Sequence, residues 1–407
     1  PAARARMSAV DERRLVGWAC DAVSIPSFTG EEQEAAEWIA DELRALGLSV
    51  QLQQVEDGRA NVLATRAGIG GGKTLMFNGH LDTSYSGREP WSQGVEGFQP
   101  AGVERGGRIW GLGISNMKGA LACYLAALDA LRDEELAGDV LVAAVSGEIE
   151  KTQYGDAQGP SYRGYAAGTR HLVTHGGVAD MCLLGEPTEG KVVLGHFGSL
   201  WARLGVGGDF VHTAFSEGRA NSVLRMGELV EPIHAWCERW AADERNAYRG
   251  VPAIASVGAI RGGFEWRLSR TPQRTSVFLD VRVPPTRPMA DARRAVLDLA
   301  RELETVHPEW EIDAEIYVTA PGAEIDEGHE LVEAIDAAHE AVFGEVPGRD
   351  VPRWFSDASA LTAYGIPTVN YGTSTGLMEP GKGESLEIDG LVKTAEVYAR
   401  VARTVCG

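Results

Sequence analysis

The stretch Lys73-Thr-Leu-Met-Phe-Asn78, followed directly by Gly79-His80-Leu81-Asp82, is a short apolar run that ends in polar residues. Similar apolar runs occupy residues 140–145 and 179–184, and short runs of this kind are typical of buried strands. Between the first two runs, residues 117–131 are apolar on all sides, which predicts a buried helix. Buried strands that alternate with helices predict an α/β fold, with a mostly parallel sheet covered by helices.

Polar residues follow three of these predicted strands directly. His80 and Asp82 follow the first, Glu148 the second and Glu186 the third. Ligands of such folds bind beyond the carboxyl ends of the strands, so we expect these four side chains to lie close together. Imidazole and carboxylate groups bind divalent metals, and a buried glutamate is a competent general base. Taken singly, each residue also fits an ordinary hydrogen-bonded pair or a solvated loop.

A fourth polar segment, residues 111–120, is rich in glycine and precedes the predicted buried helix. It carries Asn116 and Lys118. A turn of this kind presents side chains or backbone amides to a ligand, but taken alone the segment is better explained as a simple helix start with Ser115 or Asn116 as its N-cap.

The pattern changes near residue 191. The strand and helix signals that follow have the order β-α-β-β-α-β, which is typical of a ferredoxin-like domain. They lie at residues 192–206, 221–240, 251–260, 276–283 and 288–304, and a strand signal at residues 310–317 comes after them. We therefore expect a catalytic domain in two parts, residues 1–191 and 309–407, with a smaller domain inserted at residues 192–308.

The composition excludes several classes of protein. The 407 residues contain 58 acidic and 38 basic side chains, a net charge of −20, so neither nucleic acid nor an anionic membrane is an expected partner. No apolar stretch approaches the ~18 residues of a membrane span. The five cysteines are scattered without a CxxC pair, which argues against a disulfide framework and favours the reducing cytoplasm.

In this order along the chain, these residues resemble the dizinc metallohydrolases that include acetylornithine deacetylase, succinyl-diaminopimelate desuccinylase, aminoacylase and glutamate carboxypeptidase. The resemblance extends from about residue 21 to about residue 402 and implies a zinc-exopeptidase-like catalytic domain. His80 matches the first metal-binding histidine of the family, and Asp82 the aspartate that orients it. Glu148 matches the general base, and Glu186 the carboxylate ligand of the same metal.

The resemblance also assigns roles to residues outside the first third of the chain. The inserted domain is expected to form a homodimer and to carry His212, which matches the histidine that steadies the reacting carbonyl from the partner subunit. Asn221 follows this histidine and is expected to contact substrate. Asp357 and the segment Gly365-Ile366-Pro367 match a late signature near the substrate.

The sequence departs from the family pattern at the second metal. Asn116 stands where the family has the aspartate that bridges two metals, and Ile149 stands where it has a glutamate ligand beside the base. Pro380 stands where it has a late histidine, counted four residues before Glu384. Two divalent cations a few ångströms apart repel strongly, and a neutral amide does not offset that repulsion as a bridging carboxylate does.

We therefore expect one divalent metal, zinc or else manganese or cobalt, held by His80 and Glu186 with the carbonyl oxygen of Asn116 as a weak ligand. Substitute ligands in nearby segments would rebuild the second site. The candidates are Glu150, Asp156, His196 and Glu379.

The leading hypothesis is a hydrolase that cleaves an N-acyl, carbamoyl or peptide-like amide bond in a small amino-acid derivative. Glu148 would activate water, the metal would polarise the carbonyl, and His212 would stabilise the oxyanion. Lys118, Arg282 and Arg353 are candidate cations for a substrate carboxylate, and each equally fits a structural ion pair.

Two alternatives stay open. One is a metal-independent acid–base enzyme on the same fold, which catalyses a hydrolysis, a cyclisation or an elimination. The other is a catalytically inactive homologue that binds a ligand or a partner protein. The retention of Glu148 after Gly147 disfavours the second alternative, because a binding module needs no buried base.

Overall fold

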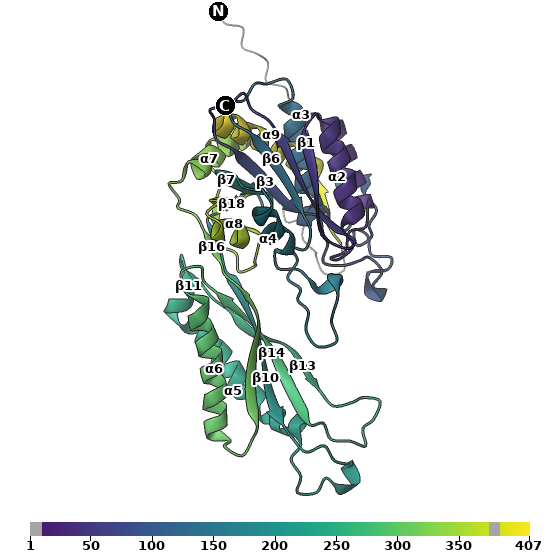
Figure 1. The fold of residues 1–407 in the computed structure, drawn as a ribbon, viewed down its shortest axis with the longest axis vertical. Helices are drawn as coiled ribbons and strands as arrows, with labels where there is room; N and C mark the ends of the chain where they lie inside the picture. The colour runs from purple at the N-terminus through teal and green to yellow at the C-terminus, as the bar shows by residue number, and fades with distance from the viewer. Residues whose placement is uncertain (1–9, 374–382) are drawn as a thin grey trace, which may run out of the picture. The chain divides into compact units, whose positions relative to one another are not determined.

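The computed structural model describes residues 10–373 and 383–407, which form two compact units. The first unit comprises the chain up to Leu194, with Glu324–Asp350 and Ser356–Gly407. The second comprises Gly195–Ala323 and Val351–Phe355. Figure 1 traces the chain through both.

An eight-stranded sheet forms the centre of the first unit, in the order β1-β2-β6-β3-β7-β18-β8-β17. The pairs β6-β3, β3-β7, β7-β18 and β8-β17 are parallel, whereas β1-β2, β2-β6 and β18-β8 are antiparallel. The predicted mostly parallel sheet is confirmed, with an antiparallel hairpin at one edge. Its strands are β1 Ser49–Glu56, β2 Arg59–Arg66, β3 Leu75–His80, β6 Val140–Val145, β7 Met181–Leu184, β8 Val192–Val193, β17 Arg349–Asp350 and β18 Thr368–Asn370.

Helices cover both faces of this sheet (Figure 1). On one face the ring of Phe77 in β3 stacks on Tyr124 of α3 at 5.1 Å and lies 5.7 Å from Tyr398 of α9. Helix α3 is buried on all sides, as its uniformly apolar sequence predicts. The opposite face carries α4 and α8. The helices of this unit are α1 Glu12–Ser24, α2 Gln33–Ala45, α3 Gly119–Ala130, α4 Ala167–Thr174, α7 Glu330–Phe343, α8 Ala358–Ala363 and α9 Ile388–Cys406.

The second unit is an antiparallel sheet in the order β13-β14-β10-β15, with two helices packed on it. This is the predicted ferredoxin-like arrangement. Its main elements are β10 Gly198–Gly207, α5 Ser222–Ala242, β13 Ala255–Gly262, β14 Arg274–Val283, α6 Met289–Val306 and β15 Ile312–Ala320. The short strands elsewhere are β4 Val103–Arg105, β5 Arg108–Trp110, β9 Gly195–His196, β11 Ala247–Tyr248, β12 Val251–Pro252, β16 Ala323–Glu324 and β19 Ser385–Glu387.

Two boundaries differ from the sequence-based expectation. Strand β15 pairs with β10, so the sheet of the second unit continues beyond the expected boundary at residue 308. The single strand expected at residues 192–206 is divided into β8, β9 and β10. Strands β9 and β10 each begin at a glycine that is closely packed: a Cβ at Gly198 would lie 2.3 Å from the carbonyl oxygen of Ala320. Apolar residues continue across the breaks, so the hydrophobic pattern of the sequence does not reveal where the strand is divided.

Within the described residues, no helix is both long and apolar enough to cross a membrane.

Candidate metal and acid–base site

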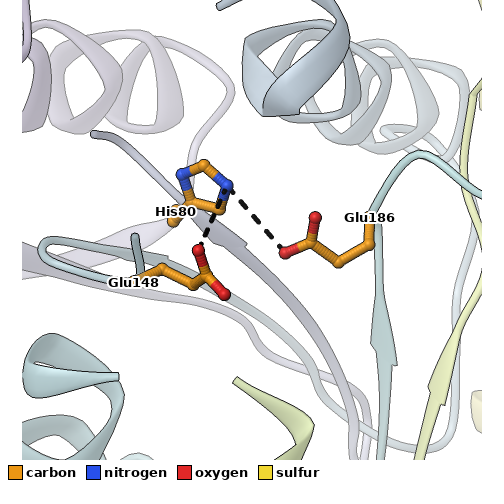
Figure 2. Close-up of side chains that lie close together, drawn as sticks. All are labelled: His80, Glu148 and Glu186. Carbon is orange, nitrogen blue, oxygen red and sulfur yellow. Dashed lines mark ion pairs between the residues drawn. The ribbon is translucent and has the colours of Figure 1, made fainter. Parts of the chain in front are cut away.

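Three side chains converge at the carboxyl ends of neighbouring strands in the first unit. His80 ends β3, which lies between β6 and β7, and Glu148 and Glu186 follow those two strands. The Nε2 atom of His80 lies 3.9 Å from Glu148 Oε2 and 3.9 Å from Glu186 Oε1. Figure 2 shows the two carboxylates directed toward this nitrogen from different sides. The expectation that these strand-end residues lie close together therefore holds in the structure.

Asp82 fixes both the histidine and the turn that carries Glu148. The Nδ1 atom of His80 bonds to the main-chain oxygen of Asp82 at 2.9 Å and lies 3.6 Å from its carboxylate. A carbonyl oxygen only accepts, so Nδ1 carries the proton and Nε2 faces the two glutamates. The Asp82 carboxylate accepts hydrogen bonds from the main-chain N–H groups of Glu148, at 3.0 Å, and Ile149, at 3.3 Å.

Gly147, the residue before Glu148, is required by close packing. Its φ is +70°, and a Cβ there would lie 2.1 Å from a guanidinium nitrogen of Arg59. Arg59 is fully buried, pairs with Glu32 at 2.8 Å and donates to the carbonyl oxygen of Arg163 at 2.8 Å. The Arg59–Glu32 pair thus anchors the loop beyond the base, and no local motif in the sequence reveals it.

Asn116 faces the same cluster, as its position in the sequence predicts. Its Oδ1 atom lies 2.9 Å from His80 Nε2. The turn before it is held by Glu384, which accepts hydrogen bonds from the main-chain N–H and the hydroxyl of Ser115 at 3.1 and 2.7 Å. Ile149 is buried and offers no ligand atom. Glu379 and Pro380 lie outside the described residues.

The buried acids of this cluster perturb one another. Burial raises the pKa of Glu148 well above its usual value, and the charges of Glu186 and Asp357 add to the rise. Burial also raises the pKa of Glu186, and it raises that of Asp357 to about 7. Burial alone would lower the pKa of His80, but Glu186 and Asp82 outweigh it and raise the value. A site of this kind is stabilised by a cation among the carboxylates.

The donor atoms fit one divalent metal. His80, Glu148 and Glu186 offer ligand atoms that all lie within 4.8 Å of one another, and Glu186 Oε1 is buried without a hydrogen-bond partner. One imidazole nitrogen with carboxylate oxygens is a donor set that zinc, manganese and cobalt accept. Over residues 10–373 and 383–407, this is the one group of three or more such residues, and Glu150, Asp156 and His196 are not in it.

The remaining predicted site residues lie in different surroundings. Asp357, at the start of α8, is buried and close enough to the cluster to raise the pKa of Glu148. The buried Lys118 places its Nζ 2.5 Å from the carbonyl oxygen of Ile25. The other four belong to the second unit and have contacts within it. His212 and Asn221 cap the helical segments that follow them, Arg282 pairs with Asp280 at 2.8 Å, and Arg353 donates to the carbonyl oxygen of Pro252 at 2.7 Å.

The model of Peptidase family M20/M25/M40 matches residues 76–404. The chain belongs to this family. The match spans all three strand-end segments and the late signature around Asp357. The predicted family is therefore confirmed, and with it an amide-bond hydrolase of the metallopeptidase type.

Known proteins similar to this chain have several activities. A succinyl-diaminopimelate desuccinylase of Gluconacetobacter diazotrophicus is 27% identical, over 95% of this chain and 96% of that protein. An N-formyl-4-amino-5-aminomethyl-2-methylpyrimidine deformylase of Bacillus subtilis is 25% identical, over 88% of this chain and 86% of that protein. Among solved structures, an M20 family metallo-carboxypeptidase of Sulfolobus solfataricus superposes with a TM-score of 0.75, over 96% and 99% of the two chains at 16% identity. This solved structure shows that the two chains share a fold.

Proposed function

We propose that this chain hydrolyses the amide bond of a small N-acyl amino-acid derivative with one divalent metal, zinc in the first instance. The observation that carries the proposal is the convergence of His80 Nε2 with the carboxylates of Glu148 and Glu186, each 3.9 Å away. His80 and Glu186 would hold the metal, and Asn116 would assist through its amide oxygen. When bound, the metal supplies Lewis-acid polarisation of the scissile carbonyl.

Glu148 is assigned the role of general base. Its carboxylate would take a proton from the attacking water and return it to the leaving amine, for which its raised pKa is suited. Asp82 holds the main-chain N–H groups of Glu148 and Ile149, and thereby fixes where this carboxylate points. Glu148 lies within ligand distance as well, so the two roles are separable only by experiment on the Glu148→Gln variant.

A single metal is favoured over two because, among the described residues, two positions that would support a second metal carry no anionic side chain. The position of the bridging carboxylate is occupied by Asn116, and Ile149 is apolar. Without a shared anion, two divalent cations about 3.5–4 Å apart would repel by roughly 17–19 kcal/mol at an effective dielectric constant of about 20. A dinuclear metal-binding peptidase of Bacillus subtilis shares the fold, with a TM-score of 0.64 and 16% identity over 97% of this chain and 98% of that one.

One observation favours a second candidate, a metal-independent acid–base enzyme. With its raised pKa, His80 can hold two protons and serve as the cation between Glu148 and Glu186. Its Nε2–H would then donate to Asn116 Oδ1, 2.9 Å away. In that state the imidazolium occupies the place that the metal would take.

Hydrolysis assays decide between these candidates. The protein is incubated with a panel of N-succinyl, N-acetyl, N-formyl and N-carbamoyl amino acids and dipeptides, after chelation and after addition of zinc, manganese or cobalt. The proposal predicts turnover that chelation abolishes and one metal restores. Turnover that is insensitive to chelator contradicts it and favours the metal-independent candidate.

We further propose a homodimer formed through the second unit, in the cytoplasm. Strand β13 supports the dimer, because it is an edge strand with mostly exposed side chains, and such an edge is a template for pairing. Five free cysteines support a reducing compartment. Sedimentation analysis tests the dimer, and a purely monomeric protein at micromolar concentration contradicts it.

A further inference from the structure

Lys151 follows the general base by three residues and is placed differently from Lys191 and Lys393, two other lysines of the first unit. Lys191 and Lys393 pair with carboxylates at 3.1 and 2.8 Å. Lys151 is half-buried, and its Nζ instead lies 3.7 Å above the centre of the Phe28 ring and 3.3 Å from the hydroxyl oxygen of Thr29. A cation over an aromatic face is attracted by the ring, so this ammonium is held in one place.

The hydroxyl of Thr29 links this ammonium to the catalytic cluster. Thr29 is fully buried and donates to Asp82 Oδ2 at 2.9 Å, which leaves its oxygen lone pairs directed to the Lys151 ammonium. Asp82 in turn accepts from the N–H groups of Glu148 and Ile149. A continuous chain of polar contacts therefore runs from Lys151 through Thr29 and Asp82 to the backbone of the base.

The segment that carries Thr29 is fixed against the strand end that carries His80 and Asp82. Phe28 forms a parallel bridge with Thr83, and the N–H of Thr83 donates to the carbonyl oxygen of Ser27 at 2.9 Å. The turn of Lys151 is fixed too, since its carbonyl oxygen accepts from Gly164 N at 3.1 Å. The segments that carry Thr29 and Lys151 are therefore both fixed by main-chain contacts, and their side chains meet without a movement of either segment.

The charges around Lys151 indicate that its ammonium serves as a counter-charge to nearby carboxylates. They disfavour a role in binding an anionic ligand. Burial lowers the pKa of Lys151 to about 8, and Asp82, Glu32 and Glu89 oppose that lowering. An anionic ligand at this ammonium would face these three acids. A fixed cation near Asp82 is instead attracted to its carboxylate through the shared Thr29 hydroxyl.

We propose that Lys151 is a positioning residue for the hydrolysis: through Thr29, its ammonium holds the Asp82 carboxylate in the orientation that presents Glu148 and His80 for reaction. The inference rests on the proposed function, because it assigns Glu148 and His80 to the chemistry. It adds a group outside the strand-end motifs.

The test compares Lys151→Met, Lys151→Arg and Thr29→Val with a matched control, Lys393→Met. Lys393 also lies over an aromatic ring, 5.6 Å from the centre of Phe343, but belongs to α9 and pairs with Asp389. The readouts are kcat and KM on the substrate that the wild type turns over, the thermal midpoint, and Co²⁺ affinity by titration.

We expect Lys151→Met to lower kcat roughly 10- to 100-fold, as outer-shell partners of metal ligands do, with KM within about twofold. Thr29→Val should lower kcat similarly, Lys151→Arg should restore it to within about threefold, and the thermal midpoint of Lys151→Met should match that of Lys393→Met. Co²⁺ affinity should fall with kcat in Lys151→Met, because both depend on Asp82.

A raised KM with unchanged kcat would overturn the inference, since Lys151 would then bind substrate. An effect no larger than that of Lys393→Met, or an arginine variant as impaired as the methionine one, would also overturn it. In these cases the wild type is active, so the proposed function stands. A wild type that neither hydrolyses the panel nor binds Co²⁺ removes the proposed function and the inference together.

Discussion

Replacement of Asn116 by aspartate puts a carboxylate back at the position that bridges two metals in the family, and its effect follows from the geometry. Asn116 Oδ1 lies 2.9 Å from His80 Nε2, and that nitrogen lies 3.9 Å from an oxygen of Glu148 and of Glu186. These distances place the new carboxylate oxygen within about 6.8 Å of each glutamate oxygen. At an effective dielectric constant of about 20, each like-charged pair then repels by about 2.4 kcal/mol or more.

We therefore expect Asn116→Asp to lower the free energy of unfolding of the metal-free protein by about 2–5 kcal/mol at alkaline pH, where both glutamates are ionised and His80 carries no charge to offset the repulsion. The repulsion raises the pKa of the carboxyls in the folded state. The destabilisation is thus full above the raised pKa and is relieved as the pH falls through it. With metal present, the added anion should raise the affinity for divalent cations by at least about tenfold.

Denaturant unfolding in chelator, near pH 8 and near pH 5.5, measures the first effect, and titration with Mn²⁺ measures the second. Asn221→Asp is a matched control for stability, because it makes the same change at the N-cap of α5, where a carboxylate is favourable. A metal-free Asn116→Asp protein as stable as the wild type, with unchanged metal affinity, would refute the placement of Asn116 against the cluster.

Two further predictions concern the base and a buried lysine. Glu148→Gln should lower kcat by about 10²- to 10⁴-fold while the metal content stays unchanged, as measured by elemental analysis, and loss of the metal would identify Glu148 as a ligand instead. Burial lowers the pKa of Lys118 to about 7, so the unfolded chain holds one more proton between about pH 7 and 10.5, and this group makes the protein more stable as the pH rises. Unfolding measured across that range should show the wild type gaining stability relative to Lys118→Met by up to about 1.4 kcal/mol per pH unit, and parallel pH profiles would contradict it.

The convergence of the candidate site residues was predictable because it depends on a rule of topology. Residues after parallel strands meet at one edge of a sheet, so His80, Glu148 and Glu186 converge wherever their strands are neighbours. The order of strands and helices was likewise enough to indicate the ferredoxin-like unit. Its end was misplaced, because β15 belongs to the sheet of the second unit by pairing, which hydrophobic patterning does not reveal.

The groups that support the cluster were not predictable from local patterns. Thr29 and Asp82 are 53 residues apart in the chain, and Arg59 reaches Arg163 across 104 residues. The residues around Lys151 carry no local pattern that predicts its contacts, whereas the structure places its ammonium on Phe28 and Thr29. Contacts of this kind depend on how distant segments pack together, and one sequence carries no periodic signal for them.

The most direct test of the central claim is the metal content per chain, measured by elemental analysis after purification and again after zinc loading and dialysis. The account predicts one tightly held metal per chain and activity that rises and falls with it. Two metals per chain would mean that other ligands replace the bridging carboxylate absent at Asn116. No metal in an active protein would contradict the account outright and transfer the chemistry to the protonated His80 with Glu148.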